Sequence, residues 1–273
     1  MNDLLEDASL KQNGNTDIPV QIRLQAGAPG FFFGVENIYK TTEYIGMPQG
    51  AEGNFVIIGG NGSGKSSGIA KPTLSTWKGT TCVTDIKGEL SKFYKELYHK
   101  GAVTRPYIIF DPKNPDAPSY DPFEWIRQDD NANLISNIWE ITIAIIPNLP
   151  DDKQPFWNQT EQGLFAAAIL YDFKLGLSFS EAICKIMSMS TSALCTELKE
   201  SNDSHVNIFL GESIDMKGDV LAAIDRGLRN KLMLFAADPY ISHAFRGRSE
   251  GAECFTWSDL DKYNIFYVFL LTE

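Results

Sequence analysis

The stretch FVIIGGNGSGKSSGIAKPTL, residues 55–74, constrains the fold more than any other part of the chain. An apolar run ends in glycines, and a lysine and two serines follow. Gly59–Ser66 satisfies the pattern G-x-x-x-x-G-K-[ST] at every specified position. Glycines let backbone N–H groups converge on phosphate oxygens, and the start of a following helix adds a favourable dipole. The sequence therefore predicts a nucleotide site between a buried parallel strand over 54–60 and a helix that Pro72 breaks or kinks early.

The motif also predicts a role for each residue of the loop. Lys65 is expected to reach the β- and γ-phosphates of ATP, and the Ser66 hydroxyl is expected to ligate Mg²⁺. The bland alternative is a glycine-rich turn with an exposed lysine. The residues expected to hold the nucleotide are Gly59, Gly60, Asn61, Gly62, Ser63, Gly64, Lys65, Ser66 and Ser67.

A phosphate loop, here Gly59–Ser66, also needs a carboxylate at the end of a neighbouring strand. Asp85 follows TTCVT, Asp111 follows YIIF, and Glu273 follows VFLLT. Each of the three has an ordinary alternative explanation, because acidic residues commonly end strands or begin turns. Glu273 is the weakest candidate, because Thr272 stands where an aspartate is usual.

Apolar strand-like segments and an amphipathic helix alternate after the loop. Strands are expected over 80–85 and 106–111, with a helix over 87–101 between them that Gly101 ends. This alternation predicts an α/β sheet with right-handed crossovers. Beyond Pro112 the periodicity becomes helical, and a strand-like run returns at 263–271. The expected helices span 131–146, 156–176, 178–188, 190–201 and 218–238.

The predicted organisation is an all-α domain inserted into a nucleotide-binding domain. Residues 1–18 are expected to be a flexible tail, and 19–121 the first part of the nucleotide-binding domain. Residues 122–244 form the insert, and 245–273 return to the nucleotide-binding domain, which is apparently truncated.

Charge and cysteine usage limit the class of protein. With 24 basic and 35 acidic residues the net charge is −11, which argues against general non-specific nucleic-acid binding and leaves room for a local basic channel in an oligomer. The N-terminus is acidic and polar, which excludes a signal peptide, and no apolar run approaches the ~20 residues of a membrane span. Four cysteines without C-x-x-C spacing are expected to be reduced core thiols: Cys82, Cys184, Cys195 and Cys254.

Two groups of side chains in the helical region have competing interpretations. Basic residues on the last expected helix and just after it either contact phosphates or form a solvated face: Arg226, Arg229, Lys231, Arg246 and Arg248. Phe156, Trp157 and Phe165 are interpreted as core aromatics because of their helical spacing.

Three further motifs accompany the loop: Asp85-x-Lys87-Gly88-Glu89, the turn Asp111-Pro112, and PFWNQTEQGLFAAAILY. With them the chain, over residues ~50–273, resembles the coupling-protein ATPases of type IV secretion and conjugation, relatives of the FtsK and HerA DNA pumps. The resemblance implies an α/β fold, a RecA-like P-loop NTPase sheet domain with an inserted all-α domain. It also implies that Asp85 and Glu89 lie near the phosphates with Lys65. The alternative for Lys87 to Glu89 is an ordinary strand-to-helix turn.

The resemblance further implies the motor portion of a conjugative coupling protein that uses ATP and Mg²⁺. Such a protein recruits DNA, relaxase–DNA or protein cargo through its helical domain and pumps it to the proteins of a secretion channel. The expected chain is cytoplasmic, monomeric alone and a homo-hexamer when complete, and partners recruit it to the inner face of the membrane. The family's Asp-Glu motif would lie beyond Glu273. A nucleotide-binding cargo adaptor without hydrolysis and a P-loop small-molecule kinase therefore remain alternatives.

Overall fold

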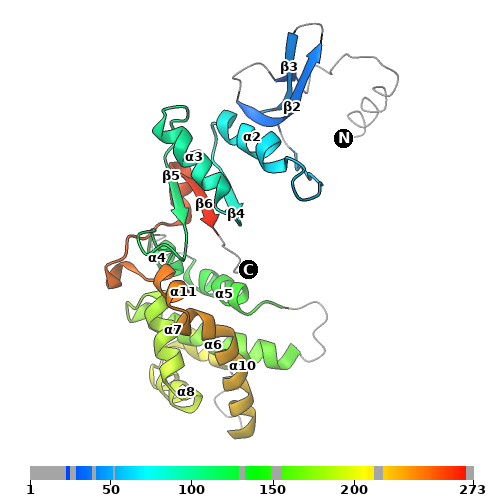
Figure 1. Cartoon of the computed structure of the whole chain (residues 1–273). Coiled ribbons are helices and arrows are strands. Elements are labelled where there is room, and N and C mark those ends of the chain that lie inside the picture. The colour runs from blue at the N-terminus through cyan, green and yellow to red at the C-terminus, as the bar shows by residue number, and fades with distance from the viewer. Residues whose placement is uncertain are drawn as a thin grey trace. The chain divides into compact units, whose positions relative to one another are not determined.

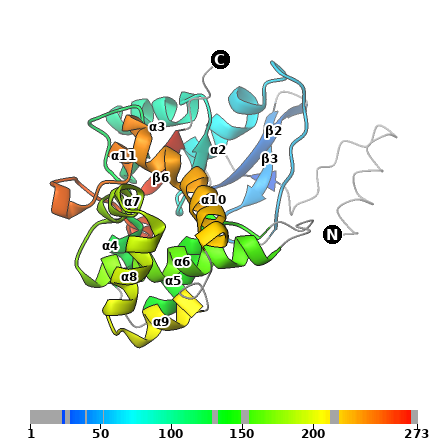
Figure 2. The same ribbon diagram turned by 90° about the horizontal axis from the view of Figure 1, so that it is seen from below.

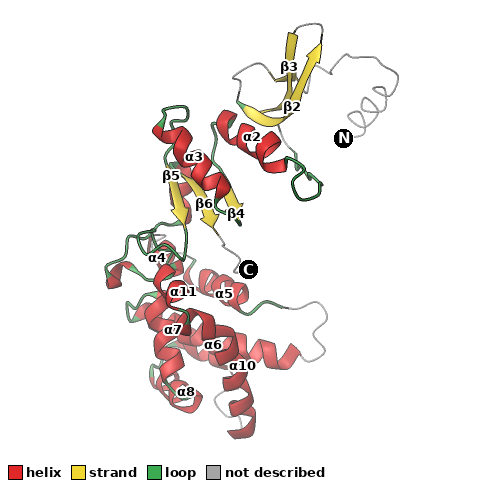
Figure 3. Cartoon of the chain, viewed as in Figure 1, coloured by secondary structure: helices red, strands yellow, loops and turns green. Residues whose placement is uncertain are grey.

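The computed structural model describes residues 23–24, 29–38, 41–51, 53–128, 133–148, 155–211 and 218–268. The chain is mixed α/β, with a small parallel sheet and many helices (Figure 1, Figure 3). It divides into two compact units, residues 1–108 with 261–273 and residues 109–260. The insert expected over 122–244 lies inside the second unit, which extends further on both sides. The expected tail, 1–18, lies outside the described residues.

An antiparallel sheet precedes the phosphate loop in the first unit. β2 (Gly30–Ile38) pairs with β3 (Thr41–Pro48), and β1 (Arg23–Leu24) pairs with the other edge of β3. The register of β2 shifts between Phe32 and Gly34. The sequence shows only a strand over 20–24 here, because a register shift destroys the period-2 alternation by which a strand is recognised.

The parallel sheet has the order β4–β6–β5 and is built from β4 (Cys82–Asp85), β6 (Asn264–Val268) and β5 (Tyr107–Phe110). These strands and α3 (Glu89–His99) lie where the sequence predicts them, and Gly101 follows the helix with φ of +70°. The buried amide of Asn264 joins them. Its Oδ1 accepts from the Thr81 N–H (3.0 Å), and its Nδ2 donates to the Tyr94 hydroxyl of α3 (2.8 Å).

The expected strand over 54–60 is not formed, which corrects the sequence prediction. Val56 is 85% exposed and Ile58 93% exposed, although both belong to the most apolar run before the loop. Phe55 does find a packing partner, because its ring stacks on that of Phe31 with 4.9 Å between the centroids, and Ile57 lines an apolar hollow. An apolar run becomes a strand only beside a backbone that can hydrogen-bond to it. No described strand pairs with this segment.

The phosphate loop leads into a π-helix, η3 (Ser66–Ala70), and then into α2 (Lys71–Thr76). Pro72 does not break this run, and it lies in the first turn of α2, directly after the π-helix ends. Two side chains of α2 bind the backbone of β2. The Thr76 hydroxyl donates to the Gly30 carbonyl (3.0 Å), and the Phe32 N–H donates to Thr73 Oγ1 (3.0 Å).

The second unit is helical, and α6 is its central helix (Figure 2). Every residue from Leu164 to Leu170 is 0% exposed, because α5, α7, α8, α9 and α10 all pack against α6. The sequence predicts five of these helices and misses α4, α9 and α11, which have only six or seven residues and show little periodicity. The helices are α4 (Pro122–Gln128), α5 (Leu134–Ile145), α6 (Pro155–Lys174), α7 (Phe179–Ser188), α8 (Thr191–Glu200), α9 (Ser204–Leu210), α10 (Gly218–Ala237) and α11 (Pro239–Ala244).

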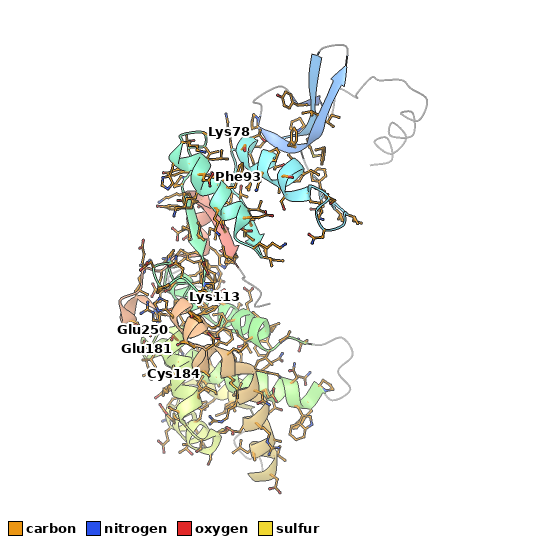
Figure 4. All side chains as sticks on the ribbon, viewed as in Figure 1. Lys78, Phe93, Lys113, Glu181, Cys184 and Glu250 are labelled. Atoms are coloured by element: carbon orange, nitrogen blue, oxygen red, sulfur yellow. The ribbon has the colours of Figure 1, made fainter. Side chains whose placement is uncertain are left out.

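Polar side chains fix the start of α7. Ser178 and Glu181 form a capping box, and the Ser178 hydroxyl also donates to Glu250 Oε2 (2.7 Å). Glu250 belongs to the short helix η5 (Arg248–Glu250), and its carboxylate lies near that of Glu181 (Figure 4). A segment 72 residues away along the chain is thereby held at the first turn of α7.

Several expected core residues are exposed. Phe165 is fully buried, but Phe156 at the start of α6 is 52% exposed. All four cysteines are free thiols; Cys195 and Cys254 are buried, whereas Cys82 and Cys184 are exposed and are not core residues. Among the described helices, none combines the length and the apolar character needed to cross a bilayer.

Candidate functional site

The phosphate loop folds as a tight backbone turn that requires glycine. Gly62 and Gly64 have φ values of +74° and +85°, a conformation that side chains rarely adopt. The Ser63 N–H donates to the Gly60 carbonyl (3.3 Å), and the Gly68 N–H donates to the Gly64 carbonyl (2.6 Å). The loop therefore ends as the first turn of a helix, and the free N–H groups of that turn are the usual ligands of phosphate at a helix start.

The Lys65 side chain folds back onto its own loop. Its Nζ donates to the carbonyl oxygens of Gly59 and Gly60 at 2.5 and 2.8 Å. A phosphate at this position would offer Lys65 charged oxygens, which form stronger hydrogen bonds than carbonyls do.

Asp85 ends β4 and caps α3 from a distance. The side chain is 3% exposed, and Oδ2 accepts from the N–H groups of Leu90 (3.0 Å) and Ser91 (2.8 Å). Gly88, with φ of +67°, turns the chain between them. Residues 87–89 thus form an ordinary strand-to-helix turn, the alternative that the sequence left open for them. A carboxylate at the start of a helix is favoured by the exposed N–H groups and the dipole.

The loop and this turn enclose one cavity of about 570 Å³. Of the residues predicted from sequence, the lining includes Asn61 to Ser67, Asp85 and Glu89, while Gly59 and Gly60 hold Lys65 through their carbonyls. The lining also includes Lys71, which sequence reasoning missed. Its Nζ lies 4.0 Å from Glu89 Oε2, so an ion pair joins the beginnings of α2 and α3.

The remaining carboxylate candidates are not brought to this cavity. Asp111 is not part of the lining, and its Oδ1 accepts from the Lys113 N–H (3.0 Å) in a local turn. Glu273 lies outside the described residues. Across the described part of the chain, no three His, Cys, Asp or Glu side chains are grouped to hold a metal ion. The Ser66 hydroxyl and the loop backbone nevertheless fit a Mg²⁺ that is bound mainly by phosphates and water.

Four of the five basic residues singled out in the sequence have partners within the helical unit, and the fifth, Arg226, is exposed. Arg229 pairs with Asp225 (2.8 Å) and donates to the Met187 carbonyl (2.7 Å). Lys231 pairs with Glu161 of α6. Arg248 pairs with Glu124 at 3.4 Å, and Arg246 Nε donates to the His243 carbonyl at 3.3 Å. These internal partners favour a structural role over contact with phosphates.

Comparison with known proteins finds a matching family and a similar protein. Residues 2–225 match the family described as Type IV secretory system conjugative DNA transfer. The conjugal transfer protein TraG of Escherichia coli is 26% identical over 145 residues, which cover 47% of this chain and 22% of TraG. The chain thus spans about a fifth of that relative's length in the match.

Proposed function

The chain belongs to the type IV secretory system conjugative DNA transfer family, and we propose that it binds ATP with Mg²⁺ at the phosphate loop as part of a coupling-protein motor. One observation carries the proposal. Lys65 and Ser66 share a cavity with Asp85 and Glu89, which come from a separate strand and helix. Its volume of about 570 Å³ suits a nucleotide, because small-molecule sites usually measure ~300–1,000 Å³. In this proposal the first unit is a RecA-like P-loop domain.

Each residue then has a defined task. The backbone N–H groups of Gly62 to Ser66 bind phosphate oxygens. Lys65 Nζ breaks its hydrogen bonds to the Gly59 and Gly60 carbonyls and donates to phosphate oxygens instead. Ser66 would hold Mg²⁺, which when bound neutralises charge that develops on the phosphates. Asp85 orients the start of α3 through the Leu90 and Ser91 amides, so that Glu89 faces the cavity.

The helical unit is proposed to contact the transported cargo, because coupling proteins act on DNA or on protein–DNA complexes. The internal ion pairs of Arg229 and Lys231 argue against strong DNA binding by this unit alone.

A second function, a nucleotide-binding adaptor without hydrolysis, is favoured by one observation. One oxygen of the Asp85 carboxylate, Oδ2, already accepts two backbone hydrogen bonds, and the other strand-end candidate, Asp111, does not line the cavity. Motor and adaptor share the nucleotide site and differ only in turnover.

Binding and turnover of ATP by the purified chain test both functions. A fluorescent ATP analogue is titrated with Mg²⁺ into wild type, Lys65→Ala and Lys78→Ala. Lys78 is an exposed lysine just beyond α2 and outside the cavity lining, and it serves as the matched control (Figure 4). We expect Lys65→Ala to abolish binding and Lys78→Ala to leave it unchanged.

The outcomes separate the candidates. Lys65-dependent turnover supports the motor, and Lys65-dependent binding without phosphate release supports the adaptor. Binding that survives Lys65→Ala would contradict the proposed site.

A further inference from the structure

The helix after the phosphate loop begins with a π-turn, and this turn selects which residue faces the loop. In η3 the Lys71 N–H donates to the Ser66 carbonyl, five residues back. In an α-helix the bond to Ser66 would come from Ala70 instead. The extra residue therefore places Lys71, rather than Ala70, one turn above Ser66. π-turns of this kind occur frequently at functional sites.

The surroundings of Lys71 and Ala70 agree with this change of position around the helix. Lys71 lines the cavity of about 570 Å³ together with Ser66 and Glu89. Ala70 instead lines a mainly apolar hollow of about 310 Å³ with Ile69 and other apolar side chains, and Lys65 and Ser66 border both spaces. The π-turn thus sends the lysine toward the phosphates and the alanine toward apolar packing.

Lys71 is held in the cavity by two residues of α3. Its Nζ lies 4.0 Å from Glu89 Oε2 and 5.5 Å from the centre of the Phe93 ring, which projects from α3 (Figure 4). The side chains of Lys71 and Glu89 are 30% and 43% exposed, and ion pairs at such exposure are weak. The several negative charges of a triphosphate in the same cavity would compete well for this lysine.

We propose that Lys71 is a second phosphate-binding side chain of the site, and that Glu89 is its counter-ion while no nucleotide is bound. The inference rests on the proposed nucleotide site and deepens it. When phosphate enters, Lys71 leaves the Glu89 carboxylate as Lys65 leaves the Gly59 and Gly60 carbonyls. Glu89 is then a free carboxylate within the cavity, so occupation of the site itself releases it.

The test compares the affinities of Lys71→Gln, Lys71→Arg and Lys78→Gln for Mg²⁺–ATP and for AMP, with Lys65→Ala as the reference for a lost site. Loss of one charge-assisted hydrogen bond should weaken ATP binding by Lys71→Gln roughly tenfold. AMP binding should change less, because fewer phosphate charges are present. Lys71→Arg should keep most of the affinity, and Lys78→Gln all of it. Glu89→Gln, which removes the competing carboxylate, should bind ATP more tightly than wild type.

The melting temperatures of the unliganded variants show whether each is folded. If Lys71→Gln has a lower melting temperature than wild type, Lys71→Arg becomes the deciding variant. Retained affinity of Lys71→Arg for Mg²⁺–ATP supports the inference, and lost affinity overturns it. If Lys71→Gln binds ATP as tightly as Lys78→Gln while Lys65→Ala binds none, this inference fails and the proposed site stands. If wild type binds no ATP even at millimolar concentration, both fail.

Discussion

Asp121 carries a buried carboxylate in the helical unit, and only one of its two oxygens accepts hydrogen bonds within the described part of the chain. The residue is 0% exposed, and its Oδ1 accepts from the N–H groups of Phe123 (2.9 Å) and Phe179 (3.3 Å). Its Oδ2 makes no hydrogen bond within the described part of the chain, and Arg127 Nη1 lies 3.7 Å away. Burial raises the pKa of Asp121 from 3.8 to about 6, against the opposing effects of these amides and of Arg127.

This carboxylate should make stability depend on pH in the acidic range. The pKa of Asp121 is higher in the folded state than in the unfolded state, so protonation favours folding. The contribution is complete below about pH 4 and is lost as the pH rises through about 6; it amounts to roughly 3 kcal/mol. We expect Asp121→Asn to flatten the pH dependence of the free energy of unfolding, measured by urea denaturation at about pH 4.5 and about pH 7.5.

The control for this prediction is Asp116→Asn, at an exposed position of the same unit. It should keep the wild-type pH dependence. Parallel pH profiles for wild type and Asp121→Asn would show that the Asp121 proton is not held more tightly in the folded state.

At the scale of single residues, the sequence predicts the cavity lining well where the backbone follows a known turn. Asn61 to Ser67 line the cavity because Gly62 and Gly64 adopt the positive φ that this turn requires, and Asp85 joins them because it ends β4 of the parallel sheet. Lys71 could not be predicted. Its direction depends on a π-turn, and no residue pattern distinguishes that turn from an α-helical one.

Between elements, α6 and α9 approach each other closely at Gly163. A Cβ atom added there would lie 2.7 Å from the carbonyl oxygen of Phe209, a backbone atom that cannot rotate away. We expect Gly163→Ala to lower the free energy of unfolding by ~1–3 kcal/mol, because the two helices must separate. Thermal unfolding followed by circular dichroism measures the loss.

Gly218→Ala is the matched control, because an added Cβ at this first residue of α10 meets no atom within 4 Å. It should leave stability unchanged or raise it slightly, since alanine favours helix over glycine. Equal melting temperatures for the two variants would mean that α9 can shift without loss of packing.

The elements that the sequence predicts are those with local signals. Ser178 caps α7, and Gly101 follows α3 in a left-handed conformation, so their helix ends can be read from single residues. The prediction of a strand over 54–60 is wrong for the opposite reason. Its apolar composition is that of a buried strand, but a strand also needs a neighbouring backbone, which a local pattern cannot guarantee.

In the whole molecule, the two ends of the helical unit are joined to each other by backbone hydrogen bonds. The Ser119 N–H donates to the Glu253 carbonyl (2.7 Å), and the Phe255 N–H donates to the Ser119 carbonyl (3.0 Å). The Tyr120 N–H donates to the Ala244 carbonyl (2.9 Å). The chain therefore enters and leaves this unit at adjacent points, as expected of an insertion that folds around its own core.

The first unit lacks this independence, because its parallel sheet uses strands from both sides of the insertion. β6 lies between β4 and β5 in the sheet, although it follows the helical unit in sequence. The buried Asn264 of β6 binds Thr81 and Tyr94. A chain that ends before the insertion therefore leaves the Thr81 N–H without this acceptor, and the Tyr94 hydroxyl keeps only its bond to the Arg105 carbonyl.

We therefore expect opposite behaviour from two fragments. Residues 109–260 should fold alone, with a helical circular dichroism spectrum and one cooperative thermal transition, because the core around Leu164–Leu170 lies entirely within them. Residues 1–108 should show no cooperative transition, because the central strand of their sheet is missing. A cooperative transition in 1–108 would mean that the first unit can fold without β6. The absence of such a transition in 109–260 would mean that the helical unit depends on the first unit for folding. In that case the proposed cargo binding by the helical unit would have to be measured on the whole chain.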